Sequence, residues 1–132
     1  MEQCRILLVE DAVDNQRLFS IFLKKAGAEV ILAGNGREGV NAVEAALRDG
    51  RPFDLILMDM LMPVMDGLTA TNILRERGID TPIVALTGNV MQEAQDRCYA
   101  AGFTDFLTKP IQRDTLLSLV MKIIGTKPQE GL

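Results

Sequence analysis

Five polar side chains of three chemical kinds each follow a short apolar run of the sequence. Glu10 and Asp11 come directly after the first run, and Asp59 comes directly after the third. Thr87 follows the fourth run, and Lys109 comes just after the last. Open sheets of parallel strands bind ligands outside the carboxyl ends of their strands. We therefore expect three carboxylates, one hydroxyl and one amine to meet at one edge of a sheet.

Three neighbouring carboxylates repel one another, at a cost on the order of 1 kcal/mol per close pair in water and several at a partly buried surface. They stay ionised only if a cation compensates their charge. Lys109 supplies one positive charge. A hard divalent cation with oxygen ligands, Mg²⁺ or Ca²⁺, can supply the rest. The adjacent Glu10 and Asp11 suit a pair that holds this metal.

A carboxylate in such a site can attack phosphorus and form an acyl phosphate. The metal and Lys109 would neutralise charge on the equatorial oxygens of the transition state, and Thr87 would donate a hydrogen bond to a phosphoryl oxygen. Asp59 is the best candidate nucleophile because Glu10 and Asp11 are assigned to the metal. Taken singly, each residue could be a helix cap, a loop charge or a solvated lysine. Their joint placement at four strand ends favours a shared site.

The runs that position these residues are short and almost entirely aliphatic, which is typical of parallel strands covered on both faces. They are Ile6–Val9, Val30–Ala33, Leu55–Met58, Ile83–Leu86 and Phe106–Leu107. Stretches with a helical apolar period separate them, and the first carries a stripe of Leu18, Ile21 and Phe22. Predicted helix caps are Asp14, Asn35, Asp66 and Asp114. Five alternations of strand and helix predict a doubly wound, five-stranded parallel α/β sheet with helices on both faces.

Length and composition exclude several classes of function. The 132 residues suit one domain, and we expect its boundaries at 4–124, with a polar tail or linker over 125–132. The formal charge of −4 argues against direct nucleic-acid binding. No apolar run is long enough to span a membrane and no segment resembles a signal peptide, so a cytoplasmic location is expected. The sequence has no histidine, which excludes Ser/His/Asp catalysis, His-ligated zinc and an internal histidine phosphodonor.

Four segments together resemble the signature blocks of receiver domains, the response-regulator modules of two-component signalling. They are Ile6-Leu-Leu-Val-Glu-Asp11, Met58-Asp-Met-Leu-Met-Pro-Val-Met-Asp-Gly67, Ala85-Leu-Thr-Gly88 and Phe106-Leu-Thr-Lys-Pro110. The resemblance covers residues 4 to 124 and implies the strand order 2-1-3-4-5. Asp14-Asn-Gln16 and Leu86-Thr-Gly-Asn89 are similar to the receivers of hybrid or phosphorelay histidine kinases.

The resemblance implies a role for each matching position. Asp59 would be the phosphoacceptor and would bind Mg²⁺ (or Mn²⁺) directly, together with Asp11 and the backbone carbonyl of Leu61. Glu10 would act mainly through a bound water, and Lys109 would pair with the phosphoryl group. The remaining positions are the activation switch Thr87 and Phe106, a cis peptide bond between Lys109 and Pro110, and the lifetime-tuning residues Leu61 and Asn89.

The implied function is a phosphoacceptor that switches a partner-binding surface and catalyses only its own phosphorylation and dephosphorylation. Its phosphodonor would be a histidine kinase or a histidine phosphotransfer protein. Its output would be a downstream protein or an attached output domain.

Two other functions remain open at this point. Gly34, Gly36 and Gly39 fit the G-x-G-x-x-G pattern of a dinucleotide fingerprint, which would indicate a small nicotinamide-binding domain. This alternative leaves the polar residues at the other strand ends unexplained, and a tight turn into a helix accounts for the same glycines. The second alternative is a docking domain that never carries phosphate. Uptake of a phosphoryl group from a small acyl phosphate would exclude it.

Overall fold

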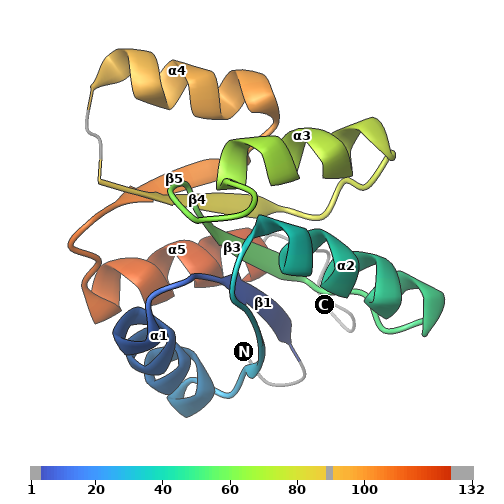
Figure 1. The fold of residues 1–132 in the computed structure, drawn as a ribbon. Helices are drawn as coiled ribbons and strands as arrows, with labels where there is room; N and C mark the ends of the chain where they lie inside the picture. The colour runs from blue at the N-terminus through green and yellow to red at the C-terminus, as the bar shows by residue number, and fades with distance from the viewer. Residues whose placement is uncertain (1–3, 89–90, 126–132) are drawn as a thin grey trace.

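The chain folds into a parallel sheet that lies between two layers of helices (Figure 1). The computed structural model describes residues 4–88 and 91–125. In chain order the elements are β1 (Arg5–Val9), α1 (Val13–Lys25), β2 (Glu29–Ala33), α2 (Gly36–Arg48), β3 (Leu55–Asp59), α3 (Gly67–Glu76), β4 (Ile83–Thr87), α4 (Gln92–Ala101), β5 (Asp105–Thr108) and α5 (Arg113–Gly125). The strand order is β2-β1-β3-β4-β5, and every neighbouring pair is parallel. The predicted fold and strand order are confirmed.

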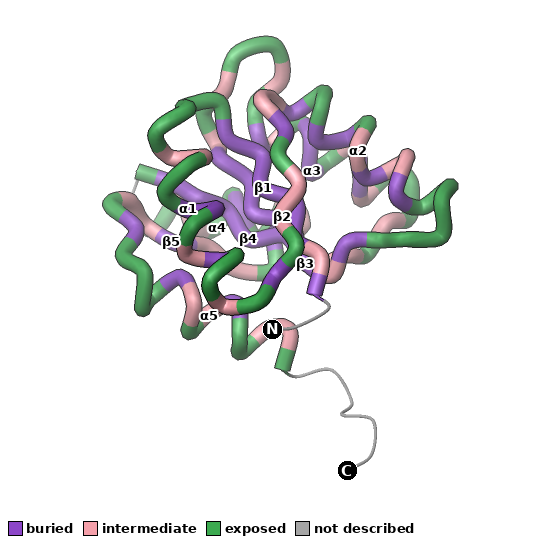
Figure 2. The backbone as a smooth tube through the Cα atoms, turned by 90° about the horizontal axis from the view of Figure 1, so that it is seen from below, coloured by how far each residue is buried: buried purple, intermediate pink, exposed green. Residues whose placement is uncertain are grey.

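Two apolar cores cover the sheet, one on each face. Successive strand residues point to opposite faces, so Leu7 and Val9 of β1 pack under α2, α3 and α4 while Ile6 and Leu8 pack against α1 and α5. The central strands β1, β3 and β4 are therefore almost entirely buried, whereas the edge strands β2 and β5 keep partly exposed residues (Figure 2). This double burial explains why the central strands are unbroken apolar runs.

The predicted apolar stripe of α1 is wrong in its phase. Phe19 and Leu23 enter the core, whereas Leu18 and Ile21 are 43% and 50% exposed. Of the predicted stripe only Phe22 packs against the core, and it is partly buried. Both sets of positions have helical spacing, so periodicity alone could not choose between them. The outcome leaves two large apolar side chains on the outer surface of α1.

Two of the four predicted helix caps are correct. The side chains of Asn35 and Asp66 each accept a hydrogen bond from the backbone amide three residues later. Asp14 and Asp114 instead lie inside the first turns of α1 and α5. A carboxylate there still interacts favourably with the positive end of the helix dipole.

Arg75, near the end of α3, fastens the C-terminal end of α4. Its guanidinium donates hydrogen bonds to the carbonyl oxygens of Gly102, Ile79 and Thr81 at 2.9, 2.8 and 2.9 Å. Gly102 ends α4 with a φ of 103°. A Cβ atom at that position would lie only 2.7 Å from Cγ of Arg75. The glycine thus allows the arginine to lie directly against the end of α4.

The predicted domain boundaries, 4–124 with a tail over 125–132, stay a prediction. α5 ends at Gly125, and the rest of the predicted 125–132 tail lies outside the described residues. Across 4–88 and 91–125, none of the helices has the length and apolar character needed to cross a membrane.

Candidate functional site

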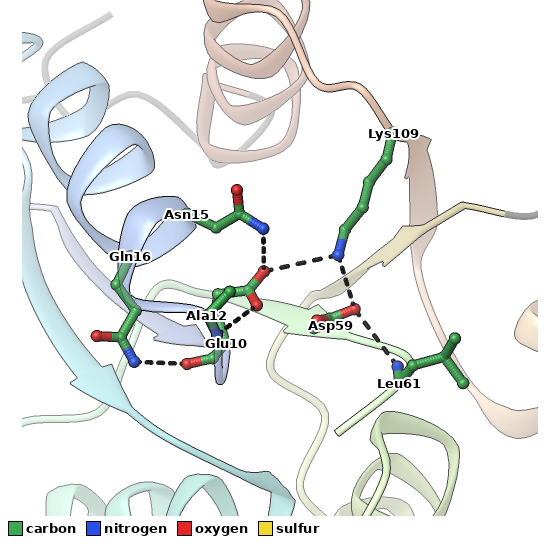
Figure 3. Close-up of polar contacts among 7 residues, drawn as sticks. All are labelled: Glu10, Ala12, Asn15, Gln16, Asp59, Leu61 and Lys109. Carbon is green, nitrogen blue, oxygen red and sulfur yellow. Dashed lines mark hydrogen bonds and ion pairs between the residues drawn. The ribbon is translucent and has the colours of Figure 1, made fainter. Parts of the chain in front are cut away.

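The predicted site residues meet at the carboxyl ends of the strands. Carboxylate oxygens of Glu10, Asp11 and Asp59 all lie within 4.8 Å of one another. Nζ of Lys109 lies 3.2 Å from Oδ1 of Asp59 and 3.7 Å from Oε1 of Glu10 (Figure 3). Glu10 and Asp59 are buried, while Asp11 is exposed. One amine therefore bridges two buried carboxylates beside a third that is open to solvent.

The first turn of α1 is built around Glu10. Oε2 of Glu10 accepts a hydrogen bond from the amide of Ala12 at 3.0 Å, and Oε1 accepts one from the Asn15 side chain at 3.4 Å. The Gln16 side chain donates to the Glu10 carbonyl oxygen at 2.6 Å (Figure 3). Asn15 and Gln16 belong to the segment that resembles receivers of hybrid kinases, but their contacts with Glu10 were not predicted. The sequence pattern that could have indicated these contacts is a pair of amide side chains five and six residues after Glu10. A helix begins there, so its first side chains can extend toward Glu10.

Glu10 has a strongly perturbed ionisation. Its pKa is raised from 4.5 to about 7, chiefly because burial penalises the charged form and further because of the neighbouring Asp59. The Ala12 amide and the Lys109 ammonium oppose this rise. Near neutral pH the carboxyl of Glu10 is thus poised between its two protonation states. A divalent cation beside it would favour the ionised state.

Asp59 is held by the loop that follows β3. Its Oδ1 accepts a hydrogen bond from the Leu61 amide at 3.4 Å. Gly67 opens α3 directly against the backbone of Asp59, where a Cβ atom would lie 2.2 Å from the Asp59 carbonyl oxygen. Only glycine allows this approach. The glycine thereby allows α3 to begin directly beside the backbone of Asp59.

Of the other predicted positions, all but Asn89 belong to the described residues. Thr87 ends β4 and is buried. Phe106 is partly buried on β5, beside Ala85 of β4. The peptide bond between Lys109 and Pro110 is cis, the isomer expected from the family resemblance. Leu61 is 82% exposed at the rim of the site, and Asn89 lies outside the described residues.

Comparison with known proteins places this chain in a family. The family model described as "Response regulator receiver domain" matches residues 6–121. The chain belongs to this receiver family. The match covers all five strands except Arg5 at the start of β1, and it includes the loops that carry the acidic cluster and Lys109.

Three of the proteins similar to this chain are a histidine kinase, the receiver domain of another histidine kinase and a receiver bound to a histidine phosphotransfer protein. Histidine kinase 1 of Arabidopsis thaliana is 35% identical over 97% of this chain, which spans only 13% of that protein. The receiver domain of sensor histidine kinase PA1611 from Pseudomonas aeruginosa has a TM-score of 0.82 at 38% identity, covering 93% of this chain and 98% of that one. Its structure holds a magnesium ion coordinated in the active site cleft. The Saccharomyces cerevisiae Ssk1 receiver, co-crystallised with the histidine phosphotransfer protein Ypd1, has a TM-score of 0.87 at 28% identity, with 99% and 95% covered.

Two of the three glycines of the dinucleotide-like motif allow close packing in this receiver. A Cβ atom at Gly36 would lie 2.4 Å from the Met65 carbonyl oxygen, and one at Gly39 would lie 2.9 Å from the Val9 side chain. The motif also follows β2, an edge strand. It therefore lies away from the crevice at which such sheets bind ligands.

Val64 in the β3–α3 loop is held in a strained conformation. Its φ is 71°, and the Met65 amide donates to the Pro63 carbonyl oxygen at 2.7 Å across it. This is the geometry of a γ-turn with positive φ, which is rare and unfavourable for a β-branched residue. Val64 is also 76% exposed, so burial of its side chain does not offset the energy of the strained backbone.

Val64→Gly should therefore stabilise the domain. The substitution relieves backbone strain on the order of 1–3 kcal/mol in the folded state. Glycine also makes the unfolded chain more flexible, which costs roughly 0.5–1 kcal/mol. The free energy of unfolding should therefore rise by about 1 kcal/mol. Urea denaturation measures this gain. Leu61→Gly in the same loop is the matched control, because Leu61 is exposed but has no positive φ. It should lose stability, and equal effects of both substitutions would contradict the strain argument.

Proposed function

We propose that this receiver takes a phosphoryl group on Asp59 in a Mg²⁺-dependent reaction and switches a partner-binding surface in response. The observation that carries the proposal is the contact of Lys109 with Asp59 at 3.2 Å inside a cluster of three carboxylates. The proposal includes a cytoplasmic phosphorelay as the setting.

The donor set fits a magnesium ion. Three carboxylates offer one oxygen each within a space of 4.8 Å, and carboxylates with waters are the ligands that Mg²⁺ prefers, with Mn²⁺ as an alternative. Asp11 and Asp59 would hold the ion directly with the Leu61 carbonyl, and Glu10 would act through a water. When bound, the ion supplies positive charge beside the equatorial oxygens of the transferred group.

Each residue of the site would have its own role in phosphoryl transfer. A carboxylate oxygen of Asp59 bonds to phosphorus as the bond from phosphorus to the donor, a phosphohistidine nitrogen or an acyl oxygen, breaks. Lys109 already lies at Asp59 and would neutralise a phosphoryl oxygen. Thr87 would donate its hydroxyl to another oxygen, and Phe106 would turn inward as Thr87 moves. Leu61 and Asn89 would tune the lifetime of the aspartyl phosphate.

A small acyl phosphate tests this function without any partner. Incubation of the wild type with acetyl phosphate and Mg²⁺ should add one phosphoryl mass to the intact protein. The same incubation with a metal chelator should add none. Absence of the added mass with Mg²⁺ present would favour a receiver that docks partners without carrying phosphate.

A surface for a phosphodonor protein adjoins the site. α1 begins two residues after Asp11, and its outer surface carries Ile21, Val13 and Leu18, all exposed. Between α1 and β2 lies a groove of about 400 Å³ lined by Val13, Gln16, Arg17, Ser20, Ile21, Lys24 and Leu32. An exposed apolar surface with a basic rim is suited to a protein partner. We propose that a histidine phosphotransfer protein or histidine kinase docks there.

Ile21→Glu should impair transfer from a protein donor and spare transfer from acetyl phosphate. A charge buried at the centre of an interface lowers affinity by about tenfold or more. The rate of phosphoryl transfer from a phosphorylated histidine phosphotransfer protein that is active on the wild type measures this loss. Leu47→Glu on α2 is the matched control, because Leu47 is 46% exposed and Ile21 is 50% exposed. Equal losses in the two variants would refute docking on α1.

A further inference from the structure

The ring of Phe106 is held against a second aromatic ring. The centroids of Tyr99 and Phe106 lie 6.0 Å apart with their planes at 77°, an edge-to-face arrangement. Such pairs are attractive beyond the burial of their area, because the positive edge of one ring meets the negative face of the other. Tyr99 comes from α4 and Phe106 from β5, so the pair joins a helix to the edge of the sheet.

Tyr99 is itself fixed to β5 by its hydroxyl. The Tyr99 hydroxyl donates to Oδ1 of Asp105 at 3.3 Å, and the same oxygen accepts the Phe106 amide at 2.8 Å. The Asp105 carboxylate therefore fixes both the Tyr99 hydroxyl and the backbone of Phe106, the residue whose ring Tyr99 contacts. Tyr99 is half exposed, so its own burial accounts poorly for this arrangement.

We propose that Tyr99 is a positioning residue that holds the Phe106 ring in its observed place and thereby weakens capture of the phosphoryl group. The proposal rests on the proposed function, in which Phe106 turns inward when Thr87 moves to the phosphoryl oxygens. A turn of Phe106 away from its observed place would break its contact with the Tyr99 ring. Because phosphoryl binding and ring position are linked, whatever stabilises the observed ring position lowers the affinity for the phosphoryl group by the same factor.

The size of the effect follows from the ring pair. An edge-to-face pair should change the equilibrium constant between the observed and the inward positions of the Phe106 ring by about 2- to 12-fold. Removing the tyrosine ring should therefore raise phosphoryl affinity by up to that factor. The affinity for Mg²⁺ alone should not change, because neither ring belongs to the acidic cluster.

Beryllofluoride with Mg²⁺, a non-covalent mimic of the phosphoryl group, tests the proposal on the whole chain. Tyr99→Ala and Tyr99→Leu should each lower the half-saturating beryllofluoride concentration by about 2- to 12-fold. Tyr99→Phe keeps the ring but loses the hydrogen bond to Asp105, so its half-saturating concentration should fall between those of the wild type and the alanine variant. In the alanine variant without beryllofluoride, the ring NMR signals of Phe106 should move toward those of the saturated wild type.

The outcomes separate the two proposals. Wild-type affinity in both Tyr99→Ala and Tyr99→Leu, with Phe106 signals unmoved, would overturn the positioning role and leave the phosphoacceptor function intact. Failure of the wild type to bind beryllofluoride while it binds Mg²⁺ would overturn the phosphoacceptor function, and the positioning role with it. A gain in affinity for Mg²⁺ alone would also overturn the positioning role.

Discussion

Asp59→Asn should abolish the phosphoryl mass that the wild type gains from acetyl phosphate and Mg²⁺. The amide has nearly the same shape as the carboxylate but lacks its nucleophilic oxygen, so a loss of at least about 10³-fold in rate is expected, equivalent to about 4 kcal/mol of activation free energy. Asp59 is the carboxylate closest to the Lys109 ammonium. Intact-protein mass spectrometry over a time course measures the loss.

Asp114→Asn provides a matched control for this experiment. Asp114 lies on α5 with its side chain 85% exposed, so the same chemical change there should leave phosphoryl uptake at the wild-type rate. The asparagine variant at position 59 should still unfold cooperatively in urea. A phosphoryl group that appears on Asp59→Asn at Glu10 or Asp11 would refute the assignment of the nucleophile.

The metal-free protein should lose stability as the pH rises from about 4.5 to about 7. The folded pKa of Glu10 is about 7 against an ordinary value of 4.5, so between these values the folded state holds a proton that the unfolded state has lost. Raising the pH removes this advantage. The total loss is about 3 kcal/mol, from 1.36 kcal/mol per pKa unit. Glu10 is almost fully buried, so solvent screening reduces the loss little.

Urea denaturation at pH 5 and pH 8, with a chelator and with Mg²⁺, measures this dependence. Saturating Mg²⁺ should restore stability at pH 8 and do little at pH 5, because metal and proton compete for the same carboxylates. Glu10→Gln cannot titrate and should flatten the difference between the two pH values in the chelated protein. A slope unchanged by this substitution would show that other groups cause it.

The sequence was most informative where a single geometric rule applies. Carboxyl ends of parallel strands share one edge of a sheet, and this rule was enough to bring Glu10, Asp59 and Lys109 together. The unbroken apolar runs likewise determine burial on both faces and hence the layers of the fold.

Prediction failed where two solutions have the same pattern. The α1 stripe was assigned to Leu18 and Ile21, although Phe19 and Leu23 fill the core. Helical spacing cannot distinguish these sets, because the choice depends on how each side chain fits the opposing strands. The contact of Asn15 with Glu10 was missed for a different reason, since its signal is the position of one amide after the strand and not a repeating pattern.

The hydrogen bond from Arg75 to Gly102 fixes one end of α4, so the helix could tilt about that end. Its C-terminal end is anchored at Gly102. The helix has ten residues and is therefore about 15 Å long. A tilt of about 10° about the anchored end would carry the other end through roughly 2.6 Å. If Thr87 moves on phosphorylation, as the proposed function requires, a displacement of α4 about this anchor would be largest at the N-terminal end of the helix, which follows β4.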